Sequence, residues 1–125
     1  MKLNVAILAN RAWLDENTLL CIEGGGWEFI GAREFPWTVS GALAGLVEIG
    51  PDDLSQKPVL HLAIRTDGEL AGSAGSIVIP PVRNLVPFVW PFSVVVIDEA
   101  MLTFEAADDA GDHLWSMSIG VRLQP

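Results

Sequence analysis

The sequence predicts an all-β fold: a single-domain antiparallel β-sandwich of about eight strands, immunoglobulin-like or C2-like. Short apolar runs recur with a period of two, turn residues separate them, and no convincing amphipathic helix interrupts them. The one helical candidate is a single turn at residues 51–54. A length of 125 residues suits one core, and no linker or internal repeat divides residues 1–125.

The N-terminal segment predicts a β-hairpin. A polar pair, Asn10–Arg11, separates an apolar run at residues 3–9 from a second run at residues 19–22, and we expect the turn at this pair. A bend follows the second run, formed by Gly24, Gly25, Gly26 and Trp27. We expect positive φ or a close backbone approach in the glycine triplet, which then seats the indole. The triplet lacks the Lys–Ser/Thr of a phosphate loop, so phosphate binding is not expected.

The middle of the chain contains two longer strand patterns. Residues 38–49 alternate, with β-branched residues and glycines on one parity, and predict a strand. Residues 59–66 also alternate and run into Asp67–Gly68, a tight-turn dipeptide that predicts a hairpin. The sequence does not identify the strand that pairs with residues 59–66. Residues 71–76 have the composition of a loop tip, and residues 77–79 read as a short strand.

Prolines limit where the strand that follows residue 80 can lie in a sheet. Pro87 and Pro91 bracket residues 88–90, which must lie on a sheet edge or in an irregular crossing because proline donates no ladder hydrogen bond. Residues 94–97 are apolar on both parities and predict a strand that is buried on both faces. Two further alternating strands complete the sandwich, at residues 102–106 and 114–123.

The chain is strongly acidic, with 16 acidic and 7 basic residues and a formal net charge of −9. This field repels phosphate backbones and anionic lipid headgroups, so neither nucleic acid nor a membrane surface is expected as a partner. The negative charge keeps the protein soluble, or it attracts a cation or a basic partner protein. The N-terminus lacks a cleavage pattern, no run is long enough for a spanning helix, and the single cysteine forms no intrachain disulfide. We therefore expect a cytoplasmic protein.

Two segments together resemble a known group of proteins. Residues 20–27 end in the glycine triplet and a tryptophan, and residues 110–120 form a glycine turn into an aromatic strand. The pair is similar to an uncharacterised family of small bacterial all-β proteins, and the match covers both ends of the chain. The resemblance implies a sandwich fold and brings no activity, cofactor or catalytic residue. His113 stands where the family favours tyrosine.

The second segment also has a physical interpretation. Gly111 and His113 follow an acidic turn at the start of a strand, as in the corner of immunoglobulin-like sandwiches, where a ring side chain bonds back to the preceding loop. We expect His113 to do this through a ring N–H. His61 and Arg65 share the polar parity of their strand, and we interpret the pair as part of a solvated sheet surface.

Acidic residues in two loops are weak candidates for Ca²⁺ ligands. If both loops lie at one end of the sandwich, hard oxygen ligands could converge there. The candidates are Asp98, Glu99, Asp108, Asp109 and Asp112. Their spacing is not that of an EF-hand, and solvated turns are the commoner interpretation. No other metal and no cofactor is expected, because no third nitrogen or sulfur ligand is placed beside the two histidines.

Tryptophan supplies the main functional lead. The chain has five tryptophans and no tyrosine, and indoles that lie beside prolines are candidates for surface contact. We expect an apolar interaction patch, formed by Trp37, Val86, Phe88, Trp90 and Phe92. The favoured function is a non-catalytic protein-interaction or assembly module that binds a protein partner or self-associates.

Two other classes of function stay open. A ligand-binding sandwich would bind carbohydrate through exposed indoles, or Ca²⁺ through the acidic loops. A small hydrolase-type enzyme is the least favoured, because the chain has two histidines and no serine in a nucleophile-elbow context.

Overall fold

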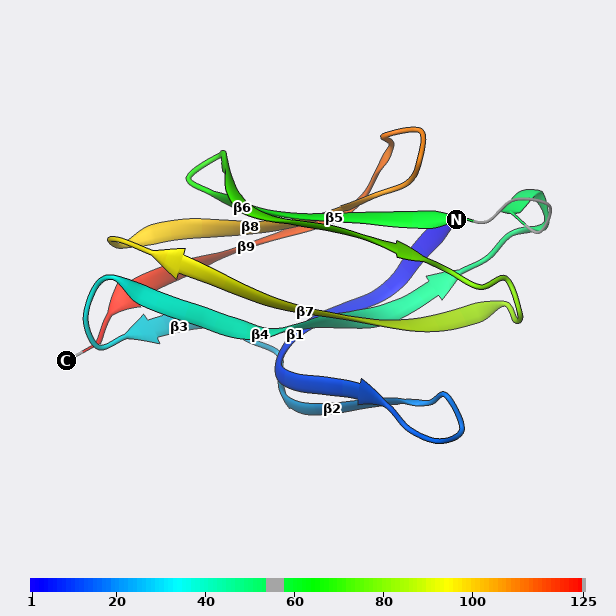
Figure 1. Cartoon of the computed structure of the whole chain (residues 1–125), viewed down its shortest axis with the longest axis horizontal. Helices are drawn as coiled ribbons and strands as arrows, with labels where there is room; N and C mark the ends of the chain where they lie inside the picture. The colour runs from blue at the N-terminus through cyan, green and yellow to red at the C-terminus, as the bar shows by residue number, and fades with distance from the viewer. Residues whose placement is uncertain (54–57, 125) are drawn as a thin grey trace.

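The computed structural model describes residues 1–53 and 58–124 and shows two packed β-sheets (Figure 1). The four-stranded sheet has the order β2-β1-β4-β7, with β1 (Lys2–Leu14), β2 (Leu20–Gly25), β4 (Trp37–Glu48) and β7 (Leu85–Val96). The five-stranded sheet has the order β3-β9-β8-β5-β6, with β3 (Phe29–Ala32), β5 (Val59–Thr66), β6 (Glu69–Val78), β8 (Ala100–Ala107) and β9 (His113–Leu123). The predicted all-β sandwich is confirmed, with nine strands in the described residues.

One edge of the five-stranded sheet departs from the predicted antiparallel pairing. β3 runs parallel to β9, with Phe29 opposite Gly120, whereas the other strand pairs are antiparallel. β2 and β3 are consecutive in the chain but belong to different sheets. A strand that changes sheet is not bound to its neighbour by a hairpin, so its direction is not fixed by a tight turn.

The predicted N-terminal hairpin is confirmed, but its turn lies later than expected. β1 continues through Asn10–Arg11 to Leu14 and pairs with β2 in one continuous register. The turn lies at residues 15–18, where the carboxylate of Asp15 accepts hydrogen bonds from the N–H groups of Asn17 and Leu19. The polar pair does not break the strand because this half of the hairpin projects from the sandwich into solvent (Figure 1).

The hairpin at Asp67–Gly68 is confirmed. Both residues have positive φ, 49° and 88°, which is the geometry of a two-residue type I′ turn. The expected loop tip at residues 71–76 is wrong, because these residues belong to β6, which pairs with β5. The pairing register shifts between Ile64 and Arg65, which marks a bulge near the turn.

β7 is an edge strand, as the prolines predicted. It pairs with β4 on one side, and within the described part of the chain it has no strand partner on the other. The expected burial of residues 94–97 on both faces is wrong. Val94 and Val96 are buried, but Val95 is 62% exposed and Ile97 is 81% exposed, because one face of this sheet end is open to solvent.

The core lies between the two sheets and receives alternate residues from their strands. Phe92 of β7 contacts Phe104 of β8 across the sandwich, with ring centroids 5.0 Å apart. The predicted strand at residues 102–106 is confirmed, with its inward residues Leu102, Phe104 and Ala106 buried. The expected helical turn is present as a 3-10 turn at Pro51–Asp53, and Leu54 lies outside the described residues. No helix among the described residues is long and apolar enough to cross a membrane.

Candidate functional site

The predicted interaction segment at residues 86–92 lies largely in the core. Val86, Phe88 and Phe92 are buried because alternate residues of β7 face the five-stranded sheet. Trp90 is partly buried, and its indole lies against Gly75 of β6. The prediction of an apolar surface patch here is therefore wrong. Prolines marked the edge position of the strand correctly, but an edge strand still buries the side chains that point inward.

Trp37 lies in a different place, beside a hollow of about 430 Å³. Trp27 and Phe29 also line this hollow, and Asn10 and Ser40 add an amide and a hydroxyl. Phe29 is exposed and the two indoles are partly buried, so aromatic surface borders the hollow. The structure thus separates Trp37 from Trp90, which the sequence had placed in one patch.

The glycine triplet positions the indole of Trp27. Gly24 and Gly26 have positive φ, 62° and 88°, as expected for the bend. The indole Nε1 of Trp27 donates to Asn10 Oδ1 at 3.0 Å and to the carbonyl of Gly24 at 3.2 Å. Its ring also meets Phe92 edge to face, with centroids 6.0 Å apart. These contacts hold the bend against the core.

The acidic Ca²⁺ candidates do not converge. Asp98 and Glu99 precede β8, whereas Asp108, Asp109 and Asp112 follow it, so the two groups lie at opposite ends of the sandwich (Figure 1). An extended strand of 8 residues separates them by about 25 Å. Within residues 1–53 and 58–124, no group of three or more potential ligands could hold a metal ion. The conditional prediction of a shared Ca²⁺ site is therefore wrong.

Three of these acidic side chains, those of Asp98, Glu99 and Asp108, instead accept hydrogen bonds from backbone N–H groups. Asp98 Oδ1 accepts from the N–H of Glu99 at 2.8 Å, and Glu99 Oε2 accepts from the N–H of Leu123 at 3.0 Å. In the other loop, Asp108 Oδ1 accepts from the N–H of Asp112 at 2.8 Å. The bonds to Asp98 and Asp108 order their own turns, whereas the bond to Glu99 joins the turn before β8 to the end of β9.

The β8–β9 turn has the expected glycine but not the expected histidine contact. Gly111 has φ of 83°, and its N–H bonds to the carbonyl of Asp108 at 3.0 Å. His113 is exposed, and among the described residues its ring makes no hydrogen bond to the preceding loop. The Asp108 side chain closes the turn instead, by accepting a hydrogen bond from the N–H of Asp112.

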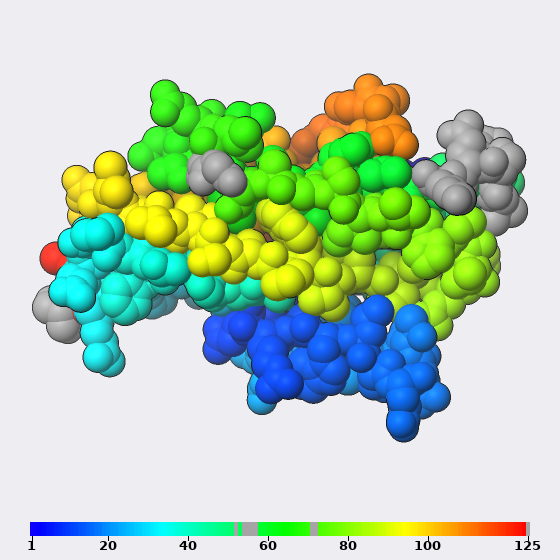
Figure 2. All heavy atoms as spheres, viewed as in Figure 1, coloured from blue at the N-terminus to red at the C-terminus, as the bar shows by residue number. Residues whose placement is uncertain are grey.

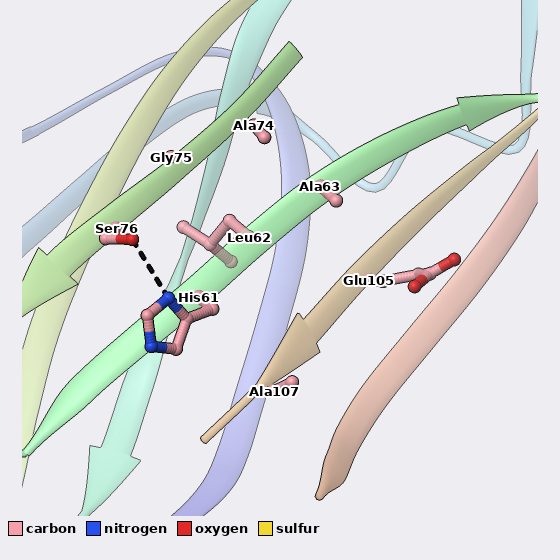
Figure 3. A pocket seen from close by; sticks show the side chains of 8 residues that line it. All are labelled: His61, Leu62, Ala63, Ala74, Gly75, Ser76, Glu105 and Ala107. Carbon is pink, nitrogen blue, oxygen red and sulfur yellow. Dashed lines mark hydrogen bonds between the residues drawn. The ribbon is translucent and has the colours of Figure 1, made fainter. Parts of the chain in front are cut away.

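His61 has polar partners on both ring nitrogens. It lies on the outer face of β5, where Nδ1 is 2.9 Å from Ser76 Oγ and Nε2 is 2.7 Å from Asp109 Oδ1 (Figure 3 shows the contact with Ser76). Arg65 on the same face pairs with Glu105 at 2.6 Å. The solvated face expected for His61 and Arg65 is present, but the partnership of His61 with Ser76 was not predicted.

The free edge of β6 is the second feature that sequence reasoning missed. β6 forms the end of its sheet, and within the described residues its second side has no strand partner. Figure 2 shows its atoms on the viewed face, beside those of β7. A continuous β6 could have been inferred from the turn at Asp67–Gly68, because a tight turn brings the following residues back along the first strand.

In comparisons with known proteins, no protein-family model matches the chain, and no curated protein matches it.

Proposed function

We propose that the protein is a cytoplasmic interaction module that binds an extended, positively charged segment of a partner protein along the free edge of β6. One observation carries the proposal: among the residues that the structure describes, no strand pairs with the outer edge of β6, which contains no proline and one charged residue, Glu69, at its start. The main-chain groups on such an edge pair readily with another extended chain.

The neighbouring edge of β7 is protected against such pairing. Pro87 and Pro91 have no N–H. Both lie at the alternate positions of β7 whose backbone groups point to the free edge and not toward β4. One carbonyl on this side is also occupied, because Ser73 Oγ of β6 donates to the carbonyl of Ser93 at 3.1 Å. β7 is therefore a poor acceptor of a further strand.

The two edge strands on the other side of the sandwich, β3 and β2, are also less suited than β6 to pairing with an added strand. β3 is only 4 residues long. β2 has 6 residues with the charged Glu23 inside the strand, whereas β6 has 10 residues and its one charge, Glu69, is at the first position. Short edges and charged edges are common protections against strand addition, so β6 is the most accessible template in the described chain.

Charge favours a basic partner over a second copy of the chain. The net charge is −9, so two copies repel one another. Two acidic residues lie near this edge. Glu69 is the first residue of β6, and Asp109 contacts His61 of β5, the strand that pairs with β6. An extended segment with lysine or arginine would meet a complementary field along this edge.

A peptide of alternating lysine and valine is a suitable probe. We expect it to slow backbone hydrogen exchange in β6 when it binds, because added strand pairing protects edge amides. Ala74→Lys should weaken binding roughly tenfold, a loss of about 1.4 kcal/mol, since an edge lysine blocks pairing and repels the basic probe. Val95→Lys on β7 makes the same charge change and should bind nearly as wild type.

Two results would contradict this function. Equal binding losses in both variants would show attraction by net charge alone. Protection of β6 in the protein without peptide, together with a dimer in sedimentation, would identify a second copy as the occupant.

A carbohydrate-binding sandwich is the second candidate, favoured by the aromatic hollow beside Trp37. Sugars stack on aromatic rings and bond to amides and hydroxyls, and the hollow offers Trp27, Phe29, Asn10 and Ser40 for this purpose. Titration with a panel of soluble oligosaccharides should then change tryptophan fluorescence. Trp37→Ala should abolish the change, and Trp13→Ala, at a residue that does not line the hollow, should not.

A further inference from the structure

Three side chains from separate parts of the chain meet on the outer face of the five-stranded sheet. His61 belongs to β5, Ser76 to β6 and Asp109 to the β8–β9 loop. The ring of His61 bridges the other two, with Nδ1 at 2.9 Å from Ser76 Oγ and Nε2 at 2.7 Å from Asp109 Oδ1. Figure 3 shows the imidazole turned toward the hydroxyl of Ser76.

The order of donors and acceptors follows from the chemistry of these groups. The carboxylate of Asp109 can only accept, so the neutral ring of His61 carries its proton on Nε2. Nδ1 then has a free lone pair, and the hydroxyl of Ser76 donates to it. The arrangement is hydroxyl to imidazole to carboxylate, in which a serine is activated by a base and the base is oriented by an acid.

The backbone fixes this arrangement from both sides. Strand pairing places His61 directly opposite Ser76, and Leu60 and Leu62 are buried on the inner face, which turns the ring outward. The β8–β9 turn that carries Asp109 is closed by hydrogen bonds to Asp108. The side chains of His61 and Asp109 are 44% and 63% exposed, so an external molecule can reach them.

A hollow of about 400 Å³ lies beside Ser76. Small residues line it, including Ala63, Ala74 and Ala107, so there is room next to the hydroxyl for a short acyl group. Glu105 also lines the hollow, and Asp109 lies at His61. These acidic groups disfavour an anionic substrate and leave neutral esters as the compatible class.

We propose that Ser76 is an acyl-accepting nucleophile for small neutral carboxylic esters, with His61 as its general base and Asp109 as the residue that orients His61. This activity goes beyond the partner binding proposed for the edge of β6 and does not depend on it.

The proposed reaction proceeds through an acyl-enzyme intermediate on Ser76. Ser76 Oγ forms a bond to the ester carbonyl carbon while its proton moves to His61 Nδ1, and Asp109 stabilises the imidazolium through Nε2–H. The tetrahedral intermediate breaks its bond to the leaving alkoxide or phenoxide, which takes the proton from Nδ1. Acyl-Ser76 and a free alcohol or phenol result. Water then attacks the acyl carbon with His61 as base, releasing the carboxylic acid and restoring Ser76.

The test uses p-nitrophenyl acetate and the full chain. We expect release of p-nitrophenol and addition of an acetyl group to Ser76, located by peptide mass spectrometry. His61→Ala should slow acylation at least about 100-fold, the effect typical of losing a general base. Added imidazole should restore part of that rate. Asp109→Asn should cause a smaller loss, because it removes only the charge that orients the ring.

Two variants serve as matched controls. Ser116→Ala removes an exposed serine of β9 on the same sheet, and His113→Ala removes the other histidine, so both should acylate Ser76 at the wild-type rate. Acetylation of Ser116 at a rate equal to that of Ser76 would overturn the proposal. It would also be overturned if His61→Ala acylated at full rate, or if wild type gave no acetyl-Ser76. Loss of peptide binding in the β6 experiment would leave this result unaffected, so the two proposals fail separately.

Discussion

Trp90 of β7 lies against Gly75 of β6 so closely that a Cβ atom on Gly75 would be 2.7 Å from the indole Nε1. The contact packs β7 against β6, the edge strands of the two sheets. It also explains why a residue without a side chain stands in the middle of a strand, where glycine is otherwise unfavourable.

The first prediction is that Gly75→Ala destabilises the protein. The new methyl group must displace the indole, which should lower the free energy of unfolding by about 1–3 kcal/mol in urea denaturation. Gly120→Ala is the control, because its Cβ would meet its nearest neighbour, Arg122 Nε, at an ordinary 3.6 Å. That variant should differ from wild type by no more than about 0.5 kcal/mol. Equal losses in both variants would contradict the steric explanation.

The second prediction concerns the indole N–H of Trp27. Trp27→Phe removes the donor to Asn10 and Gly24, leaves two acceptors without it and shrinks a ring that packs on the core. We expect a loss of about 1–3 kcal/mol in the free energy of unfolding. Trp13→Phe is the matched change on the projecting hairpin and should cost less than about 1 kcal/mol. A larger loss for Trp13→Phe would show that the hairpin, and not the bend, depends on its indole.

The strands that the sequence predicts best are those with one buried face. In β5 and β8 the buried residues alternate strictly with others, because each strand lies inside a sheet whose outer face meets water. β6 gives no such signal. Its residues 71–76 are only alanine, glycine and serine, which fit a strand that must pass close to Trp90 but read equally as a loop.

The hydrogen-bond partners of His61 depend on the pairing register of β5 and β6, which the local sequence pattern does not predict. A regular hairpin around Asp67–Gly68 would place Ala74 opposite His61, whereas the register shift near the turn places Ser76 there. The position of Asp109 depends on long-range folding as well. By contrast, the separation of the acidic loops was predictable, because loops that flank one extended strand lie at its two ends.

The third prediction is a pH dependence set by Asp53. Its pKa is lowered from 3.8, first by the hydrogen bond to the Met1 ammonium and then by the N–H of Gly50, while burial opposes the shift. The Met1 nitrogen lies 2.8 Å from Asp53 Oδ2. A carboxyl with a depressed folded pKa stabilises the protein above its unfolded pKa, and this contribution is lost as the pH falls through the folded pKa.

Denaturation of the untagged chain between about pH 5 and about pH 2 tests this dependence. Asp53→Asn should lose less stability over this range than wild type does, because it has no proton to bind at this position. Asp112→Asn, in an exposed turn, should follow the wild-type curve. If Asp53→Asn also followed that curve, the ion pair with Met1 would not contribute to acid sensitivity.

The fourth prediction is that Pro91→Thr opens the edge of β7 to association. Threonine restores an N–H on the side of the strand that faces away from β4, and it favours extended backbone. We expect greater concentration-dependent association in sedimentation and light scattering. The effect should grow with added salt, because screening weakens the repulsion between chains of net charge −9. Pro80→Thr, in the exposed segment after β6, adds an N–H outside the edge and should stay like wild type. Association of the Pro80 variant to the same degree would show that loss of any exposed proline suffices, and that β7 is not the edge that proline protects.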